Sequence, residues 1–221
     1  MPPGTLPVMT TALRASRHET VLAHRAFRRA SALLAARIAA VEPGQPRRAA
    51  ALAGRLRAYQ RALRGHQGCQ DRLLWPVLLA RCDLGADLVL RMRAQHERLA
   101  GTLTAIDVAL PGWVATTAED DRDRLVAALV EHHAVLAEHV DEEDRDLLPL
   151  AADHLAAHEW QALRAQLLAR LRRPRLFTYL GIVLTHADRA ERRLVLATLP
   201  RRDRLGWYLV GKPWRPRWIR P

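Results

Sequence analysis

The chain has 221 residues and a formal net charge of +12. This length suits one domain of about 150 to 170 residues with an appendage, large enough to bury a core without disulfides. The two cysteines form no CxxC pair, the amino-terminal stretch lacks the features of a signal peptide, and no apolar run approaches the roughly 20 residues of a membrane span. We therefore expect a cytoplasmic protein without a membrane span.

Alanine and leucine are abundant, and apolar residues recur with the helical spacing of about 3.6 residues, so the sequence predicts an all-α fold. A first helix is expected over residues 10–40, followed by a break at residues 42–46. A second is expected from residue 47 to Pro76, which should end or kink it.

The second half of the pattern repeats this arrangement. A third helix is expected over residues 86–110, closed by Pro111 and Gly112. A fourth is expected over residues 117–148, with Pro149 standing where Pro76 stood. Two helical hairpins are therefore predicted in succession.

Beyond these hairpins the sequence predicts an appendage. A fifth helix is expected over residues 155–172, then a break at Pro174 and a short helix over residues 188–199. Residues 201–221 have the prolines and glycines of a loop or tail, with seven basic residues against one aspartate. Their tryptophans are Trp207, Trp214 and Trp218. Such a tail can contact nucleic acid through phosphates and stacking, or pack its tryptophans on the bundle.

The strongest chemical signal lies in the fourth helix. His139 and Glu143 are four residues apart, so both side chains leave the same face and can reach one metal ion. An upstream segment from His66 matches this one at a constant offset of 73 residues, but carries Gln70 in place of the glutamate. The matching positions are His66 and His139, Asp71 and Asp144, Arg72 and Arg145, Leu74 and Leu147, and Pro76 and Pro149.

Two further histidines complete the repeat. His24 precedes His66 by 42 residues, and His96 precedes His139 by 43. Related hairpins of this kind are expected to pack as an antiparallel up-down four-helix bundle with all four imidazoles pointing inward, the arrangement by which bundles build metal sites. The histidines outside this repeat, His132 among them, are expected to be surface or core residues. If a further ligand were needed, His132 would be the best spare, since it lies seven residues before His139 and on nearly the same face.

This pattern resembles the hemerythrin or HHE cation-binding family. The shared features are a histidine on the first and third helices, and HxxxE followed by leucine and proline on the second and fourth. The resemblance covers about residues 11–155, which would form the hemerythrin-like bundle. Residues 156–200 would then be a helical extension packing on it, and residues 201–221 a basic tryptophan-containing tail.

The resemblance implies a non-haem iron site that engages oxygen or a related small oxidant, for binding, sensing or storage. The implied metal ligands are His24, His66, His96, His139 and Glu143, with Gln70 at a degenerate ligand position. Asp71 and Asp144 are either acceptors that orient the imidazoles or members of salt bridges and caps. No signature of a substrate pocket is evident, so binding is favoured over enzymatic turnover.

Gln70 leaves the metal content open. Two divalent ions about 4 Å apart repel by roughly 16 kcal/mol at an effective dielectric near 20, so a pair of irons needs anionic bridges that a neutral amide does not provide. The site can hold two irons with altered bridging, for example through Glu142 or hydroxide. It can instead hold one metal, or none if only the fold is kept. The alternative function is a metal-free interaction module whose tail contacts nucleic acid or an acidic partner.

Overall fold

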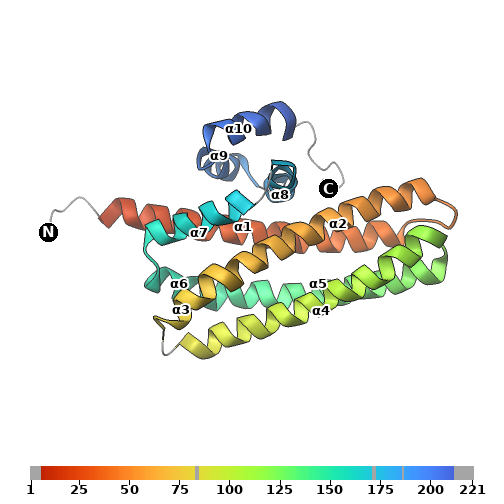
Figure 1. The fold of residues 1–221 in the computed structure, drawn as a ribbon, viewed down its shortest axis with the longest axis horizontal. Helices are drawn as coiled ribbons and strands as arrows, with labels where there is room; N and C mark the ends of the chain where they lie inside the picture. Colours follow the sequence, from red (N-terminus) through yellow and green to blue (C-terminus); the bar gives the residue numbers. More distant parts are fainter. Residues whose placement is uncertain (1–5, 83–84, 171–172, 186, 212–221) are drawn as a thin grey trace.

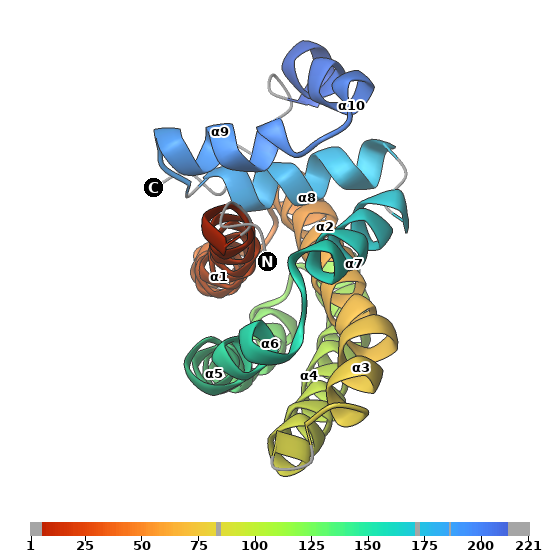
Figure 2. The same cartoon turned by 90° about the vertical axis from the view of Figure 1, so that its left-hand side faces the viewer.

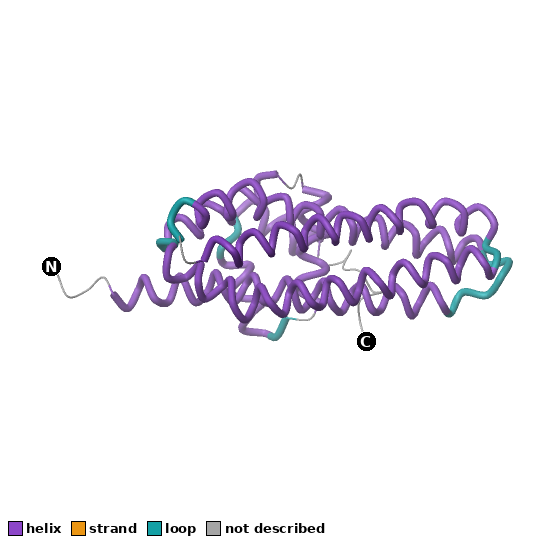
Figure 3. Tube along the Cα trace, turned by 90° about the horizontal axis from the view of Figure 1, so that it is seen from below, coloured by secondary structure: helices purple, strands orange, loops and turns teal. Residues whose placement is uncertain are grey.

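The computed structural model describes residues 6–82, 85–170, 173–185 and 187–211. These residues form helices joined by short turns and include no strand, which confirms the all-α prediction (Figure 3). The fold therefore rests on packing between helices.

Four long helices enclose the core: α1 (Leu6–Ala39), α2 (Pro46–Cys69), α4 (Ala86–Thr116) and α5 (Glu119–Glu142). α1 packs on α2, α2 on α4, α4 on α5 and α5 on α1, so their contacts form a closed ring. Figure 1 shows the chain reversing direction between α1 and α2 and again between α4 and α5. We call α1 with α2 the first hairpin and α4 with α5 the second hairpin.

In each hairpin, a π-helical turn follows the second long helix. Gln70–Leu74 joins α2 to α3 (Trp75–Leu79), and Glu143–Leu147 joins α5 to α6 (Leu148–His154). The backbone N–H of Trp75 bonds to the carbonyl of Gln70, five residues back.

The prolines account for these wider turns. Pro76 and Pro149 have no N–H to donate, and in an ordinary helix each ring would clash with the carbonyl four residues earlier. A π turn gives the ring more room, and such turns occur often at functional sites. The helix therefore continues past each proline, with one widened turn.

α4 runs beyond the expected end of the third helix. Pro111 lies inside α4, which continues to Thr116, so the prediction that Pro111 and Gly112 close this helix is wrong. Trp113 is fully buried, and its carbonyl accepts a hydrogen bond from the N–H of Thr117. Burial of this indole stabilises the turn that the proline weakens.

α4 is also the described helix that is long and apolar enough to cross a bilayer. It packs against α2 and α5 within the bundle. Its apolar residues Leu99, Leu103 and Ile106 are fully buried there, so here its composition is that of a core helix.

A polar layer divides the interior of the bundle. Leu63, Leu99 and Leu136 belong to one apolar cluster, which extends toward the α1–α2 and α4–α5 turns. A second cluster, containing Leu74 and Leu147, fills the other end. The histidines of α2, α4 and α5 lie between these clusters along their helices, so the candidate site is enclosed by apolar packing on both sides.

The remaining helices cover the first hairpin. They are α7 (Ala157–Arg170), α8 (Arg173–Thr185), α9 (Arg189–Ala197) and α10 (Arg201–Gly206). α7 and α8 contact both α1 and α2, and α9 contacts α1, as the end-on view in Figure 2 shows. We call α7 to α10 the extension.

The expected break is found next to Pro174, because α7 ends at Arg170 and α8 begins at Arg173. Pro174 lies in the first turn of α8, where an N–H has no helical partner to lose. One expectation about the extension is wrong. Residues 201–211 are helical and not a loop, because Trp207 is buried and packs on the ring of Phe177. Trp214 and Trp218 lie outside the described residues.

Candidate metal centre

The four histidines of the repeat meet in the polar layer as two contacting pairs. Nε2 of His24 lies 3.2 Å from Nε2 of His66, and Nε2 of His96 lies 3.2 Å from Nε2 of His139. All four side chains are buried. The inward direction of the imidazoles therefore matches the arrangement expected from the duplicated spacing.

Glu143 joins the two pairs. Its Oε2 lies 3.3 Å from Nε2 of His24 and 3.3 Å from Nε2 of His139, so one carboxylate contacts both hairpins. The ligand atoms of His24, His66 and Glu143 all lie within 4.8 Å of one another. This spacing suits three ligands around one ion, each at roughly 2.0 to 2.2 Å.

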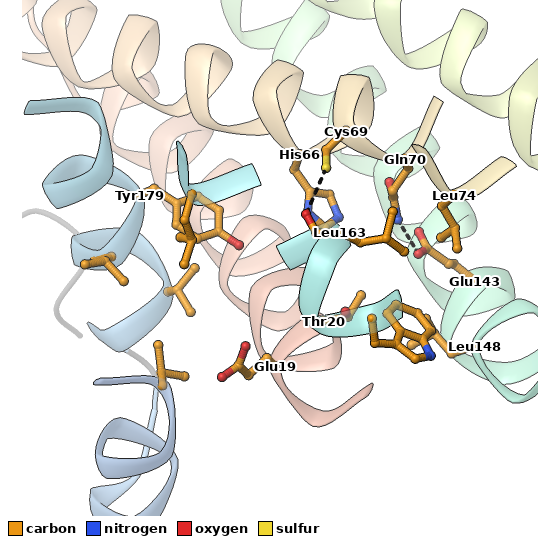
Figure 4. A pocket seen from close by; sticks show the side chains of 15 residues that line it. Glu19, Thr20, His66, Cys69, Gln70, Leu74, Glu143, Leu148, Leu163 and Tyr179 are labelled. Carbon is orange, nitrogen blue, oxygen red and sulfur yellow. Dashed lines mark hydrogen bonds between the residues drawn. The ribbon is translucent and has the colours of Figure 1, made fainter. Parts of the chain in front are cut away.

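Gln70 meets Glu143 across the interface between the hairpins. Its Nε2 donates a hydrogen bond to Oε1 of Glu143, drawn as a dashed line in Figure 4. Oε1 of Gln70 is buried and accepts no hydrogen bond from a described residue, and Oε2 of Glu143 is buried with only the two imidazole nitrogens at 3.3 Å beside it. Leaving buried acceptors unpaired costs free energy, and a bound cation would give both oxygens a partner.

Three of the imidazoles are hydrogen-bonded at Nδ1, the ring nitrogen that faces away from the centre. Nδ1 of His24 bonds to Asp144 at 2.7 Å, Nδ1 of His96 to Asp71 at 2.6 Å, and Nδ1 of His139 to Oε1 of Gln95 at 3.0 Å. The predicted role of the two aspartates as acceptors is confirmed. With the proton on Nδ1, each neutral ring presents the lone pair of Nε2 to the interior, which is how histidines are oriented toward metals.

Gln95 is a functional residue that the sequence pattern did not reveal. Its Nε2 donates to Glu142 at 2.6 Å, so Glu142 fixes the amide that orients His139. Glu142 lies outside the centre and supports it indirectly. The repeat gives no signal for Gln95, because the corresponding residue, 72 positions earlier, is Ala23.

Electrostatics favour one positive charge beside Glu143. Burial lowers the pKa of His66 to about 3, helped by the neighbouring His24. Burial would also lower the pKa of His24, but the charges of Glu143 and Asp144 outweigh it and raise that pKa. Burial would raise the pKa of Glu143, yet His24 and His139 hold it below its usual range. These shifts favour the charged form of Glu143, which is the form that binds a metal ion.

His132 has a structural role in place of a ligand's role. Its Nε2 is 2.8 Å from the hydroxyl of Tyr59, and its Nδ1 is 2.8 Å from that of Thr102. The side chain is buried and both ring nitrogens are occupied by these bonds, which agrees with the expectation of a core residue and leaves no nitrogen for a spare ligand.

Helical bundles that bind metals supply buried imidazoles and carboxylates from facing helices. The imidazoles and the carboxylate of this centre form such a donor set, and hydrogen bonds to Nδ1 orient three of the rings. The family model of the hemerythrin HHE cation-binding domain matches residues 17–151, more than half of the chain. The chain belongs to this family. No curated protein and no solved structure matches it.

Proposed function

We propose that the protein binds non-haem iron in the polar layer and through it engages oxygen or a related small oxidant, in the cytoplasm. The observation that carries this proposal is the buried group of His24, His66 and Glu143, whose ligand atoms all lie within 4.8 Å of one another. Membership of a cation-binding family supports the same assignment.

The charge of the centre favours one iron. His24, His66 and Glu143 would hold it, while His96 and His139 form a second pair of imidazoles beside the same carboxylate. A second divalent ion would add repulsion of roughly 16 kcal/mol at an effective dielectric near 20. Gln70 supplies no negative charge to offset that repulsion, so two irons would need an additional anion.

Iron bound in this place would supply an open coordination position and a reversible change of oxidation state. The chain's own residues provide the rest of the site. Asp144 and Asp71 hold His24 and His96 in the required tautomer. The apolar clusters pack on both sides of the layer, and such surroundings suit binding, sensing or storage of a small molecule.

Metal analysis of the full-length protein tests this proposal. After reconstitution with iron under anaerobic conditions, we expect about one iron per chain and a visible spectrum that changes when air is admitted. In Gln70→Glu the added carboxylate should raise the content toward two irons per chain.

Glu131→Gln is the matched control, because this exposed residue of α5 lies away from the centre. It should bind iron as the wild type does. An iron content that is unchanged in Gln70→Glu would count against the assigned site, and a wild-type protein that retains no iron after removal of excess metal would overturn the proposal.

A further inference from the structure

A cavity of about 100 Å³ lies between the first hairpin and the extension. His66, Gln70 and Glu143 line one side of it, and Tyr179 of α8 lies toward the other, as Figure 4 shows. Leu163 of α7 projects between them. The cavity therefore borders the candidate metal centre, and the extension builds its outer wall.

The walls of the cavity are chemically uniform. Apart from the groups at the metal side, they consist chiefly of leucine, valine and aromatic side chains, most of them from α7, α8 and α9, while α1 contributes Glu19 and Thr20. The chain has 35 lysines and arginines, yet none is among the described residues that line the cavity. Its acidic residues are Glu19 and Glu143. An anion would meet carboxylates and no cation there, so carboxylates and phosphates of organic ligands are disfavoured.

The metal side of the cavity offers a hydrogen-bond acceptor. Oε1 of Gln70 is buried without a donor among the described residues. A ligand hydroxyl directed to this side could satisfy it. The volume is suited to a molecule of at most about six carbon atoms, since an apolar cavity of about 150 Å³ in another protein binds benzene.

We propose that this cavity binds a neutral, mainly apolar organic molecule with one hydroxyl group, of the size of a simple phenol or a short alcohol, with its hydroxyl toward Gln70. The cavity itself does not depend on the metal. That the ligand lies beside a metal ion rests on the proposed function, so the two parts are tested separately.

The first test uses ¹⁹F NMR of 4-fluorophenol with the full-length protein and no added metal. We expect saturable broadening and a shift of the fluorine signal, with a dissociation constant in the micromolar to millimolar range. 4-Fluorobenzoate, which carries a negative charge on the same ring, should bind at least tenfold more weakly. Equal or tighter binding of the benzoate would overturn the proposed ligand class.

Two variants locate the binding. Leu163→Trp and Val183→Phe fill the cavity from α7 and α8 and should each weaken fluorophenol binding at least tenfold. Leu205→Trp is the control, because Leu205 of α10 is 60% exposed and does not line the cavity. Thermal unfolding followed by circular dichroism identifies any variant that fails to fold. If both filled variants fold and bind like the wild type, the ligand does not occupy this cavity.

Gln70→Leu tests the hydroxyl contact. This variant removes the acceptor but keeps a side chain of similar size, and it should weaken fluorophenol binding about tenfold while leaving fluorobenzene binding unchanged. An equal loss for both molecules would contradict the assigned contact.

The second test places the ligand beside the metal. Paramagnetic Co²⁺ in the centre should broaden the signal of bound fluorophenol strongly, whereas diamagnetic Zn²⁺ should not. If fluorophenol binds the metal-free protein but Co²⁺ produces no additional broadening, the cavity site stands and the placement of the metal fails. If fluorophenol does not bind at all, the cavity proposal fails whatever the metal content.

Discussion

The two hairpins share a scaffold but contribute unequally to the centre. Each supplies two inward histidines and an aspartate that orients a histidine of the other hairpin, as His24 with Asp144 and His96 with Asp71 show. The second hairpin alone supplies a carboxylate, Glu143. The corresponding residue of the first is Gln70.

A second difference concerns the residues that accept hydrogen bonds from Nδ1 of the imidazoles. Gln95 accepts from Nδ1 of His139, whereas the corresponding residue beside His66 is Ala23. His66 instead lines the cavity under the extension. The acidic inward ligand thus comes from the second hairpin, whereas the first carries an amide at that position and presents His66 to the cavity. The two halves share their geometry but differ in the charge that they bring to the site.

Removal of the single carboxylate should have the largest effect. A unit charge about 4 Å from a divalent ion contributes roughly 8 kcal/mol at an effective dielectric near 20, of which desolvation offsets a part. We therefore expect Glu143→Gln to weaken metal affinity on the order of a thousandfold or more, measured by competition with a chromophoric chelator for Co²⁺.

The double variant Gln70→Glu with Glu143→Gln moves the carboxylate to the first hairpin. Because the two positions meet across the interface, affinity should return to within about tenfold of the wild type. A metal affinity that stays low would mean that a carboxylate at position 70 cannot replace the one at position 143.

Tyr59 and His132 allow the hairpins to be compared outside the centre. They occupy corresponding positions of the two hairpins, and their side chains contact each other. Burial, with a smaller contribution from His133, lowers the pKa of His132 to about 4. Its unfolded value is near 6.5, so between these limits the unfolded chain binds more protons and stability falls as pH falls. The loss from pH 6.5 to pH 4 should reach about 3 kcal/mol.

Urea unfolding of the metal-free protein between pH 4 and pH 7.5 measures this loss. His66 contributes in the same direction because its pKa is also lowered, so the comparison with His132→Gln isolates the effect of His132. The variant should show a shallower dependence on pH. Parallel curves for the two proteins would show that His132 does not titrate as its burial requires.

The orienting aspartates should give the smallest effects and should differ between the hairpins. Asp144 holds His24, which belongs to the close group with Glu143. Asp144→Asn should therefore reduce metal affinity about 10- to 100-fold, the usual range for residues that orient metal ligands. Asp71→Asn, which acts on His96, should have a weaker effect. The reverse order, measured by the same chelator competition, would place the metal nearer His96 and His139.

Much of the centre can be predicted from the sequence because it is repeated. The offset between the halves, 72 residues for His24 and His96 and 73 for His66 and His139, identifies the four histidines, Glu143 and Gln70, and helical periodicity gives the bundle. It also aligns Asp71 with Asp144 but leaves their role open between orienting the imidazoles and forming salt bridges or caps. Gln95 escapes this reasoning, because it has no counterpart in the other hairpin. For His132 the sequence gives only the face of the helix, and the partners of its ring, Tyr59 and Thr102, are seen only in the structure.

The extension and Pro111 show a second limit of prediction from the sequence. Residues 201–211 have the composition of a loop, but the burial of Trp207 against Phe177 depends on a tertiary contact that no local pattern contains. Pro111 is a helix breaker by propensity, and the packing of Trp113 outweighs it. The cavity has no signature in the sequence at all, because its walls come from segments far apart in the chain.

The widened turn Gln70–Leu74 also sets the rotation of α3 about its own axis. One residue advances an α-helix by about 100°, so deleting a single residue here and restoring an ordinary turn would swing α3 by more than a quarter of a circle. Trp75, which is 1% exposed, would leave the end of the core. Related sequences should therefore keep the length of that segment even where its residues change. The extra residue of the widened turn determines the rotation of α3, and so decides which of its side chains enter the core.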